Sequence, residues 1–273
     1  MKIENGIVIS SEIHLSHDFM CAKDGTVVNC SSIVPAHPNQ AELKIIRGIV
    51  VHQTETNTLA ETFGPLRENK QAHIAKRPKF GRNSFHFLID KDGKIYQTFS
   101  LKYKANHIGL IHSRCIKKET CTPVEQKEYG NLYPGHWNKG YPEKIHEIER
   151  KKENRFPMNE DSIGIECVGK AYAYSADGKT RLDDVKSFKG IPENRIKFEP
   201  LTSEQLQSLE WLIRVLASHY GVLMSEVFRH PEIARKNPTE SISAKELIER
   251  LQKEEVAEKK AAEEAAKKAE AIR

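Results

Sequence analysis

Residues 44–52 read KIIRGIVVH, a nearly continuous apolar run that is rich in β-branched side chains. A run without polar alternation is typical of a strand that is covered on both faces, whereas a strand with one solvated face alternates apolar and polar residues. The stretch therefore predicts a central strand. The strand ends at His52, a residue whose imidazole can bind a metal or move a proton.

Two further segments predict strands. Residues 84–99 read SFHFLIDKDGKIYQTF, and Asp92-Gly93 between two β-prone runs is a strong hairpin signal because both positions tolerate positive φ. Residues 162–168 read SIGIECV, in which Glu166 lies on the opposite face from Ile163 and Ile165.

A helix follows these strands. Thr202 and Gln205 have the spacing of a capping box, and Gly221 stands where a helix commonly ends. Between them, apolar residues recur at helical spacing: Leu206, Leu209, Ile213, Leu216 and Tyr220. The fold class we expect is α/β, with a mixed central β-sheet flanked by helices.

The rest of the chain divides around this unit. We expect an N-terminal extension over residues 1–43, a domain over 44–250 with an irregular insertion at about 111–161, and a charged helical tail over 251–273. The insertion contains aromatic residues that either stack on sugars or pack the loop: Tyr133, Trp137 and Tyr141.

Composition excludes some classes. The 273 residues are 38% hydrophobic without an apolar run long enough to cross a bilayer, so no membrane insertion is expected. The first ten residues lack the features of a secretory signal, which predicts synthesis in the cytoplasm. A net charge of +5 is a mild bias that does not by itself indicate nucleic-acid binding.

Five cysteines without CxxC spacing favour reduced thiols over a disulfide framework. A Cys115–Cys121 or a Cys21–Cys30 bridge is the alternative.

Three residues have the chemistry of an open metal site. His52 ends the central strand, His230 follows the long helix within FRHPEIARK, and Glu166 lies on a separate strand. Two histidines and a carboxylate are a common ligand set of catalytic zinc. Each histidine alone would more often be a core residue, and the HExxH helix of many metalloproteases is absent.

Five segments together resemble one family in their order along the chain: IVVHQTE, SFHFLIDKDGKIYQ, ANHIG, SIGIECVG and RHPEIARK. The chain resembles the zinc-dependent N-acetylmuramoyl-L-alanine amidases, which include phage lysozymes of amidase type, bacterial recycling amidases and the peptidoglycan recognition proteins. The resemblance spans about residues 45–240. It implies the amidase/peptidoglycan recognition protein-like fold, Zn²⁺ as cofactor and peptidoglycan or a muropeptide as substrate.

The resemblance also implies roles for individual residues. His52 and His230 are similar to the first and second zinc ligands. Glu166 resembles the acidic residue that handles the proton of the attacking water, and Lys236 resembles the lysine that stabilises the oxyanion. His107, within ANHIG, stands where the family often places a histidine near the substrate.

Two positions depart from the family pattern. The third zinc ligand is usually Asp or Cys followed by Pro-Gly, whereas residues 236–240 read KNPTE here. Glu240 supplies the anionic oxygen that zinc prefers and is favoured over Asn237, with water or a more distant carboxylate as further alternatives. Phe85 stands where phage enzymes and recognition proteins have an active-site Tyr, so the proton chemistry would depend on Glu166.

The function we expect is cleavage of the amide between N-acetylmuramic acid and the L-Ala of the stem peptide. The alternative is a non-catalytic peptidoglycan-binding module of the same fold. The additional segments favour an antibacterial effector or lysin that acts on the cell wall, in the periplasm of a target cell, over a cytoplasmic recycling enzyme. An effector would require a cognate immunity (inhibitor) protein in the producing cell. Intact sacculus and small fragments present the same amide, so the sequence leaves the substrate's size open.

Overall fold

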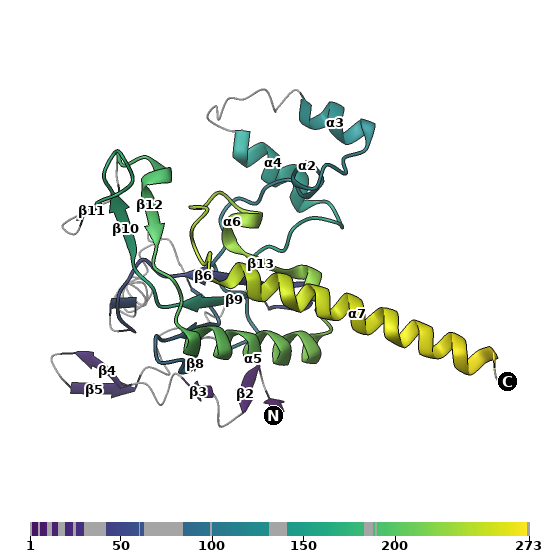
Figure 1. The fold of residues 1–273 in the computed structure, drawn as a ribbon, viewed down its shortest axis with the longest axis horizontal. Helices are drawn as coiled ribbons and strands as arrows, with labels where there is room; N and C mark the ends of the chain where they lie inside the picture. The colour runs from purple at the N-terminus through teal and green to yellow at the C-terminus, as the bar shows by residue number, and fades with distance from the viewer. Residues whose placement is uncertain are drawn as a thin grey trace.

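The computed structural model describes residues 42–271 apart from 60, 63–83, 99, 131–140, 183–187 and 189, together with 2–4, 6–9, 13–15, 20–23 and 26–29. A mixed sheet forms the centre of this part of the chain (Figure 1). Its strands lie in the order β13 (Val227–Arg229), β6 (Gly48–Gln53), β9 (Ser162–Cys167), β7 (Phe87–Ile89), β8 (Ile95–Gln97) and β3 (Ile13–Leu15). All neighbours are parallel except β7 and β8. The predicted fold class is confirmed.

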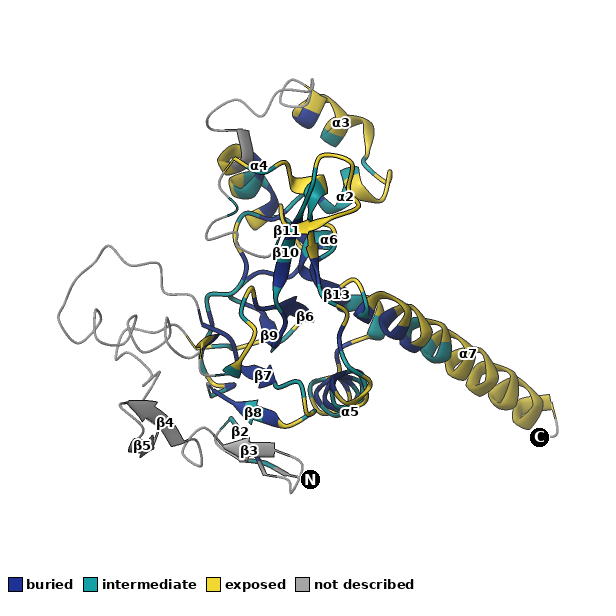
Figure 2. Cartoon of the chain, turned by 60° about the vertical axis from the view of Figure 1, so that its left-hand side comes forward, coloured by how far each residue is buried: buried dark blue, intermediate teal, exposed yellow. Residues whose placement is uncertain are grey.

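The central position of β6 follows from its apolar sequence. Every residue of β6 is buried, and Figure 2 shows β6 and β9 among the most enclosed parts of the molecule. Ile49 and Val51 pair with Ile163 and Ile165, and all four side chains belong to one hydrophobic core. Helix α5 (Ser203–Tyr220) and the first turns of α7 (Ala244–Ala271) cover this face of the sheet.

Helix α5 begins and ends where the sequence predicts. The Thr202 side chain accepts a hydrogen bond from the backbone N–H of Gln205, and the Gln205 side chain accepts one from the N–H of Thr202. Gly221 ends the helix at φ 68°, a left-handed conformation that glycine adopts without steric cost. The capping box thereby satisfies backbone donors that would otherwise lack partners.

The opposite face of the sheet has its own small hydrophobic core, and polar side chains lie on this face near the ends of the strands. Val50 contributes to a second, smaller core with Phe156 and Phe228, beneath α6 (His230–Ile233) and the segment after β8. Side chains alternate between faces, so His52 follows Val50 on this face, two residues farther along β6.

The hairpin of β7 and β8 has the predicted turn. Gly93 has φ 82°, its N–H donates to the Asp90 carbonyl, and the N–H of Lys94 donates to the Asp92 carboxylate. The turn packs close to α5, since a Cβ atom at Gly93 would lie 2.9 Å from the carbonyl oxygen of Glu204. Both the positive φ and this contact require glycine.

The 111–161 segment differs from its prediction. It was expected to be irregular, but it contains α2 (Arg114–Lys117), α3 (Pro123–Gly130) and α4 (Tyr141–Arg150). Helix α4 buries Ile145 and Glu149. The Pro and Gly residues that suggested irregular structure concentrate between α3 and α4, at residues 131–140, outside the described part. Tyr133 and Trp137 lie there too, and the side chain of Tyr141 is not described.

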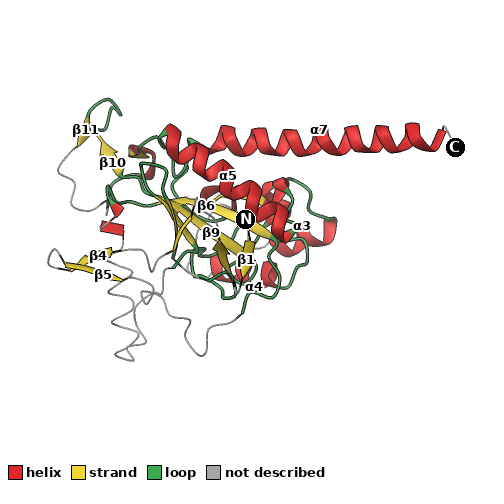
Figure 3. Ribbon diagram, turned by 90° about the horizontal axis from the view of Figure 1, so that it is seen from below, coloured by secondary structure: helices red, strands yellow, loops and turns green. Residues whose placement is uncertain are grey.

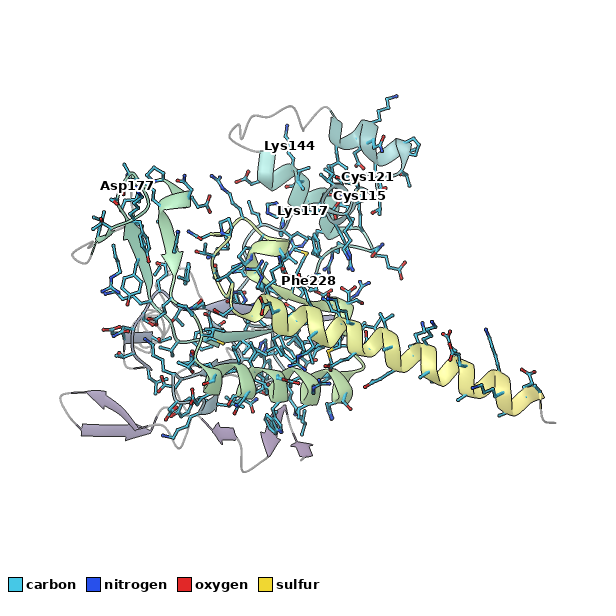
Figure 4. The ribbon with its side chains drawn as sticks, viewed as in Figure 1. Cys115, Lys117, Cys121, Lys144, Asp177 and Phe228 are labelled. Atoms are coloured by element: carbon cyan, nitrogen blue, oxygen red, sulfur yellow. A yellow bond between two sulfur atoms is a disulfide. The ribbon has the colours of Figure 1, made fainter. Side chains whose placement is uncertain are left out.

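The prediction of reduced thiols is wrong for one pair. Cys115 and Cys121 form a disulfide, with Cα atoms 4.6 Å apart, at the end of α2 (Figure 4). The chain reverses after this single helical turn and brings the two residues together, which their spacing alone does not reveal. Cys167 is a buried free thiol, and the Cys21–Cys30 alternative lies outside the described residues.

A second small sheet was not predicted. Strands β10 (Ala171–Tyr174), β11 (Arg181–Leu182) and β12 (Ile196–Phe198) form an antiparallel sheet in the order β11-β10-β12. Strand β10 begins soon after β9 ends, at the same end of the central sheet as His52. The helix η3 (Glu193–Arg195) leads into β12.

The N-terminal strands and the tail extend the molecule. Strands β1 (Lys2–Glu4) and β2 (Ile7–Ile9) form one hairpin, and β4 (Met20–Lys23) and β5 (Thr26–Asn29) form another. Helix α7 projects away from the sheet in Figure 3, and its residues beyond about Val256 are exposed. Within the described ranges, no helix is both apolar enough and long enough to cross a membrane.

The buried side chain of His86 makes the stability of the fold depend on pH. Its Nδ1 accepts a hydrogen bond from the N–H of Gly164, and its Nε2 donates to the Tyr103 carbonyl. Burial lowers the pKa of His86 to about 4, below the value of about 6.5 expected when unfolded. The unfolded chain therefore binds more protons between these values, so the contribution of His86 to stability is fully present above about pH 6.5 and is lost as pH falls toward about 4.

Because of His86, we expect the free energy of unfolding to be about 2 kcal/mol lower at about pH 5 than at about pH 7. Urea unfolding of the wild type and of His86→Gln at both pH values measures it, because the difference removes the contributions of other groups. Equal pH dependence in the two proteins would contradict the assignment.

Candidate metal centre

The strand register brings His52 and Glu166 together. They are partners across the parallel pair β6 and β9, so their side chains emerge on the same face of the sheet. His230 is the first residue of α6, directly after β13, which pairs with the other side of β6. Glu240 follows in the loop that leads to α7 and is buried. Three segments far apart in sequence therefore meet at one end of the sheet.

Two histidines face one carboxylate. Oε1 of Glu240 lies 3.3 Å from Nδ1 of His230 and 3.7 Å from Nδ1 of His52. The two imidazole rings are 4.2 Å apart between centroids. One ligand atom from each of the three residues lies within 4.8 Å of the others, a group that could hold a metal ion. The structure thus brings Glu240 to the two histidines.

The group has the protonation state that a metal requires. Burial, followed by the nearby His230, lowers the pKa of His52 to about 3, and burial lowers the pKa of His230. For Glu240, hydrogen bonding and charge interactions with both histidines overcome the effect of burial and lower its pKa to about 2. Metal ligands must be neutral imidazoles and ionised carboxylates, and this is the state at about pH 7.

Hydrogen bonds behind His52 determine which of its nitrogens carries the proton. The Ser162 hydroxyl donates to the Met158 carbonyl at 2.5 Å, so it must accept from Nε2 of His107 at 3.2 Å. Nδ1 of neutral His107 is then an acceptor, and Nε2 of His52 donates to it at 2.9 Å. The lone pair of His52 Nδ1 therefore points to the Glu240 side. Two electron-rich atoms that face each other in this way fit a cation between them.

Glu166 is a half-buried residue beside this cluster. Its Oε2 atom is buried and has no hydrogen-bond partner among the described residues. Burial first, and then the charge of Glu240, raise the pKa of Glu166 to about 8, although Lys236 opposes this rise. A carboxyl group that titrates near neutral pH can accept a proton and return it. Nε2 of His230 is the other polar atom of the cluster that is buried without a described partner.

Lys236 and Asn237 occupy different positions in the same loop. Lys236 is exposed, and its positive charge lowers the pKa of His52, His230 and Glu166, which places it within electrostatic reach of the cluster. The Asn237 side chain donates to the carbonyls of Glu193 and Ile196 and accepts from Thr239. Its amide is fully used in holding the loop against β12, so it is not part of the metal group.

His107 lies behind His52, with its ring against Gly164. A Cβ atom at Gly164 would lie 2.6 Å from Cγ of His107, so only glycine leaves room for the ring. Sequence reasoning identified His107 but missed Ser162 and Gly164. The alternation of β9 contained a signal, because Ser162, Gly164 and Glu166 all face the same side as His52. Phe85, to which sequence reasoning assigned no role, is buried.

Comparison with known proteins identifies the family. The family model described as N-acetylmuramoyl-L-alanine amidase matches residues 42–241, which include all of the residues above. No curated protein matches the chain. Among solved structures, an AmpD derivative is 18% identical at a TM-score of 0.43, and the match covers 88% of this chain and 94% of that one.

Two other solved structures are similar to this chain. AmiD from E. coli, in complex with anhydro-N-acetylmuramic acid-L-Ala-D-gamma-Glu-L-Lys, is 18% identical at a TM-score of 0.38, covering 80% of this chain and 59% of that one. The amidase LysC from Clostridium intestinale is 17% identical at a TM-score of 0.33, covering 72% and 83%. The family match includes every strand of the central sheet except β3, together with the histidine–glutamate group and Glu166. By this match the chain belongs to the N-acetylmuramoyl-L-alanine amidases, which are peptidoglycan hydrolases.

Proposed function

We propose that the chain is a zinc amidase that cleaves the bond between N-acetylmuramic acid and the L-Ala of the stem peptide. His52, His230 and Glu240 would hold the zinc ion. The observation that carries this proposal is the buried group of two neutral imidazoles and an ionised carboxylate, with the lone pair of His52 turned toward Glu240. Two histidines and one carboxylate leave a fourth zinc position for water or substrate.

When bound, zinc supplies a Lewis acid that polarises the amide carbonyl and lowers the pKa of water toward about 7. Glu166 accepts the proton of the attacking water. As the C–N bond breaks, Glu166 returns that proton to the nitrogen of L-Ala, so the carboxyl group ends in its starting state. Its position next to His52 on the neighbouring strand and its raised pKa support this role.

Lys236 stabilises the negative charge that develops on the carbonyl oxygen. Its ammonium group is exposed, yet its charge lowers the pKa of both metal-group histidines. A cation that already acts on this site in the resting enzyme favours a transition state with more negative charge there.

His107 orients His52. Its ring accepts the Nε2 proton of His52 and donates in turn to Ser162, which fixes the tautomer that presents Nδ1. Partners of this kind behind a metal ligand are usually worth a factor of roughly 10–100 in metal affinity. Contact with the substrate, which the family resemblance implies for His107, stays a prediction.

Gly164→Ala tests this orienting role. The added methyl group must displace the His107 ring, so we expect zinc affinity to fall roughly 10- to 100-fold. Competition with a chromophoric chelator measures the affinity. Gly109→Ala is the matched control, because a Cβ atom there meets nothing within 4 Å. Unchanged zinc affinity in Gly164→Ala would refute the orienting role.

The disulfide supports action outside the cytosol. Cys115 and Cys121 form a bond that persists in oxidising compartments and is rare in reducing ones. We therefore propose that the enzyme acts on the cell wall as an antibacterial effector or lysin. For an effector, the producing cell needs an immunity protein that blocks the enzyme. Expression of the chain with a periplasmic export signal is expected to lyse cells, and harmless export would contradict this role.

Digestion of purified sacculi tests the activity. Mass spectrometry of the released material is expected to show free stem peptides that begin with L-Ala, absent after treatment with a zinc chelator. Tight retention on sacculi without any release would instead favour the non-catalytic binding module.

A further inference from the structure

Each histidine of the metal group has a buried polar neighbour in the chain. Gln53 follows His52 at the end of β6, and Arg229 precedes His230 at the end of β13. The two neighbours are only 4% and 7% exposed. Long polar side chains are rarely buried without hydrogen-bond partners, so the partners of these two show what they hold in place.

Both neighbours bind the same peptide group, the one that links Glu240 to Ser241. Nη1 of Arg229 donates to the Glu240 carbonyl at 3.3 Å and to the Pro238 carbonyl at 3.2 Å. Oε1 of Gln53 accepts from the backbone N–H of Ser241 at 3.1 Å. The oxygen and the nitrogen of one peptide plane are therefore held, one by each side chain. We name the side chains of Gln53 and Arg229 the Glu240 clamp.

Other contacts fix the orientation of the Glu240 clamp. Nε of Arg229 donates to one carboxylate oxygen of Glu232 at 3.1 Å, and the other oxygen accepts from the backbone N–H of Arg229. Nε2 of Gln53 donates to the Glu199 carbonyl at 2.8 Å, which leaves Oε1 as the acceptor. A Cβ atom at Gly169 would lie 2.0 Å from this Nε2 atom, so glycine leaves the room that the amide needs.

The peptide group after Glu240 leads into a backbone conformation that needs support. Ser241 has φ 53°, in the left-handed region that residues other than glycine adopt when the surrounding structure imposes it. Its Oγ atom is buried and has no hydrogen-bond partner among the described residues, so the hydroxyl does not stabilise the turn. The support comes from Gln53 and from the N–H of Ala244, which donates to the Ser241 carbonyl at 2.9 Å.

The position of the Glu240 carboxylate depends on this backbone. Its Oε1 atom lies 3.3 Å from Nδ1 of His230 and 3.7 Å from Nδ1 of His52. Glutamate has a longer and more flexible side chain than the Asp or Cys that usually serves as third ligand in the family. Site residues have to be held to within about 0.5 Å by the groups behind them, so a free backbone at Glu240 would place the oxygen poorly.

We propose that Gln53 and Arg229 are positioning residues that hold Glu240 in place as the third metal ligand. The inference rests on the proposed function and deepens it, because it adds residues that act on the zinc through Glu240. Since each member of the Glu240 clamp is bonded in sequence to a histidine ligand, the clamp couples the position of Glu240 to the positions of both histidines. Partners of this kind are usually worth a factor of roughly 10–100 in metal affinity.

A double-mutant cycle on zinc affinity tests the Glu240 clamp. Gln53→Met keeps a similar length but lacks hydrogen-bonding groups, and it is expected to weaken zinc binding roughly 10- to 100-fold in the wild-type chain. In a Glu240→Ala background, the same substitution is expected to change zinc affinity by less than about 3-fold, because the clamp acts through Glu240. Competition with chromophoric chelators of graded strength measures the affinities of all four proteins.

Arg229→Met tests the other half of the clamp, with Arg114→Met as the matched control. Arg114 also pairs with a carboxylate, that of Glu226, and donates to a backbone carbonyl, but it does so before β13 begins, at the other end of that strand. Only Arg229→Met is expected to weaken zinc binding roughly 10- to 100-fold, while Arg114→Met stays within about 3-fold of the parent. Circular dichroism confirms that each variant is folded at the temperature of the titration.

The outcomes separate the clamp from the zinc centre itself. Parental zinc affinity in Gln53→Met and Arg229→Met would overturn the clamp, although a weakened Glu240→Ala would leave the zinc centre standing. An equal loss from Gln53→Met in both backgrounds would also overturn it, because the substitution would then disturb the site without acting through Glu240. Parental affinity in Glu240→Ala would refute Glu240 as a ligand and the clamp with it.

Discussion

Replacing His52 or His230 with Ala is expected to abolish zinc binding at stoichiometric protein concentration and to lower kcat/KM at least roughly 1000-fold. Each histidine is buried and neutral, and both face Glu240. Removal of one histidine leaves two protein ligands, whereas catalytic zinc is normally bound by three. Elemental analysis of the purified variants and hydrolysis of a soluble muropeptide measure the two effects.

His219→Ala is the matched control. His219 is exposed near the end of α5, where its ring contacts Tyr220. The control is expected to keep one zinc ion per chain and full activity. Activity that survives in His52→Ala or His230→Ala would show that the buried histidines are structural.

Glu166→Gln is expected to lower kcat by roughly 100- to 10,000-fold while the zinc content stays at one ion per chain. Gln has the same shape but cannot carry the proton from the attacking water to the leaving amine. Loss of rate with the metal retained separates this role from that of the ligands. The measurements are kcat on a soluble muropeptide and elemental analysis of the same preparation.

The pH profile strengthens this test. Burial and the charge of Glu240 raise the pKa of Glu166, so its deprotonation should determine the acidic limb of the rate profile in the wild type. That limb is expected to disappear in Glu166→Gln. Glu55→Gln is the control: Glu55 is exposed and contributes the smallest of the charge effects on Glu166, so activity should stay within about 3-fold of the wild type. A fully active Glu166→Gln would contradict the proton-transfer role.

Strands β6, β7, β8 and β9 of the central sheet could be predicted because their signals are local, whereas the edge strands β13 and β3 were not predicted. The unbroken apolar run of β6, the Asp92-Gly93 turn and the Thr202 capping box each fix a conformation within a few residues. The small sheet has no such signal. Its strands are short, and β10 pairs with β12 across a long intervening segment that includes β11. Such pairing depends on contacts that a local pattern does not encode.

The site residues that could be predicted are those with suitable side-chain chemistry at or near the ends of predicted elements. His52 and Glu166 could be placed at the ends of two predicted strands and His230 after the long helix, and the family resemblance then implied a role for each of them. The choice between Glu240 and Asn237 required the fold, because the carbonyls of Glu193 and Ile196, far back in the sequence, occupy the Asn237 amide. The contact of Ser162 with His107 spans a similar distance and was missed for the same reason.

Zinc reconstitution of the metal-free enzyme tests the zinc centre most directly. After exhaustive chelation, zinc is added back in steps, and release of L-Ala-terminated peptide from a soluble muropeptide is followed at each step. We predict that activity rises linearly and reaches its plateau at one zinc ion per wild-type chain, with no recovery in Glu240→Ala. Full activity in the metal-free wild type, or equal recovery in Glu240→Ala, would contradict a zinc centre built from His52, His230 and Glu240.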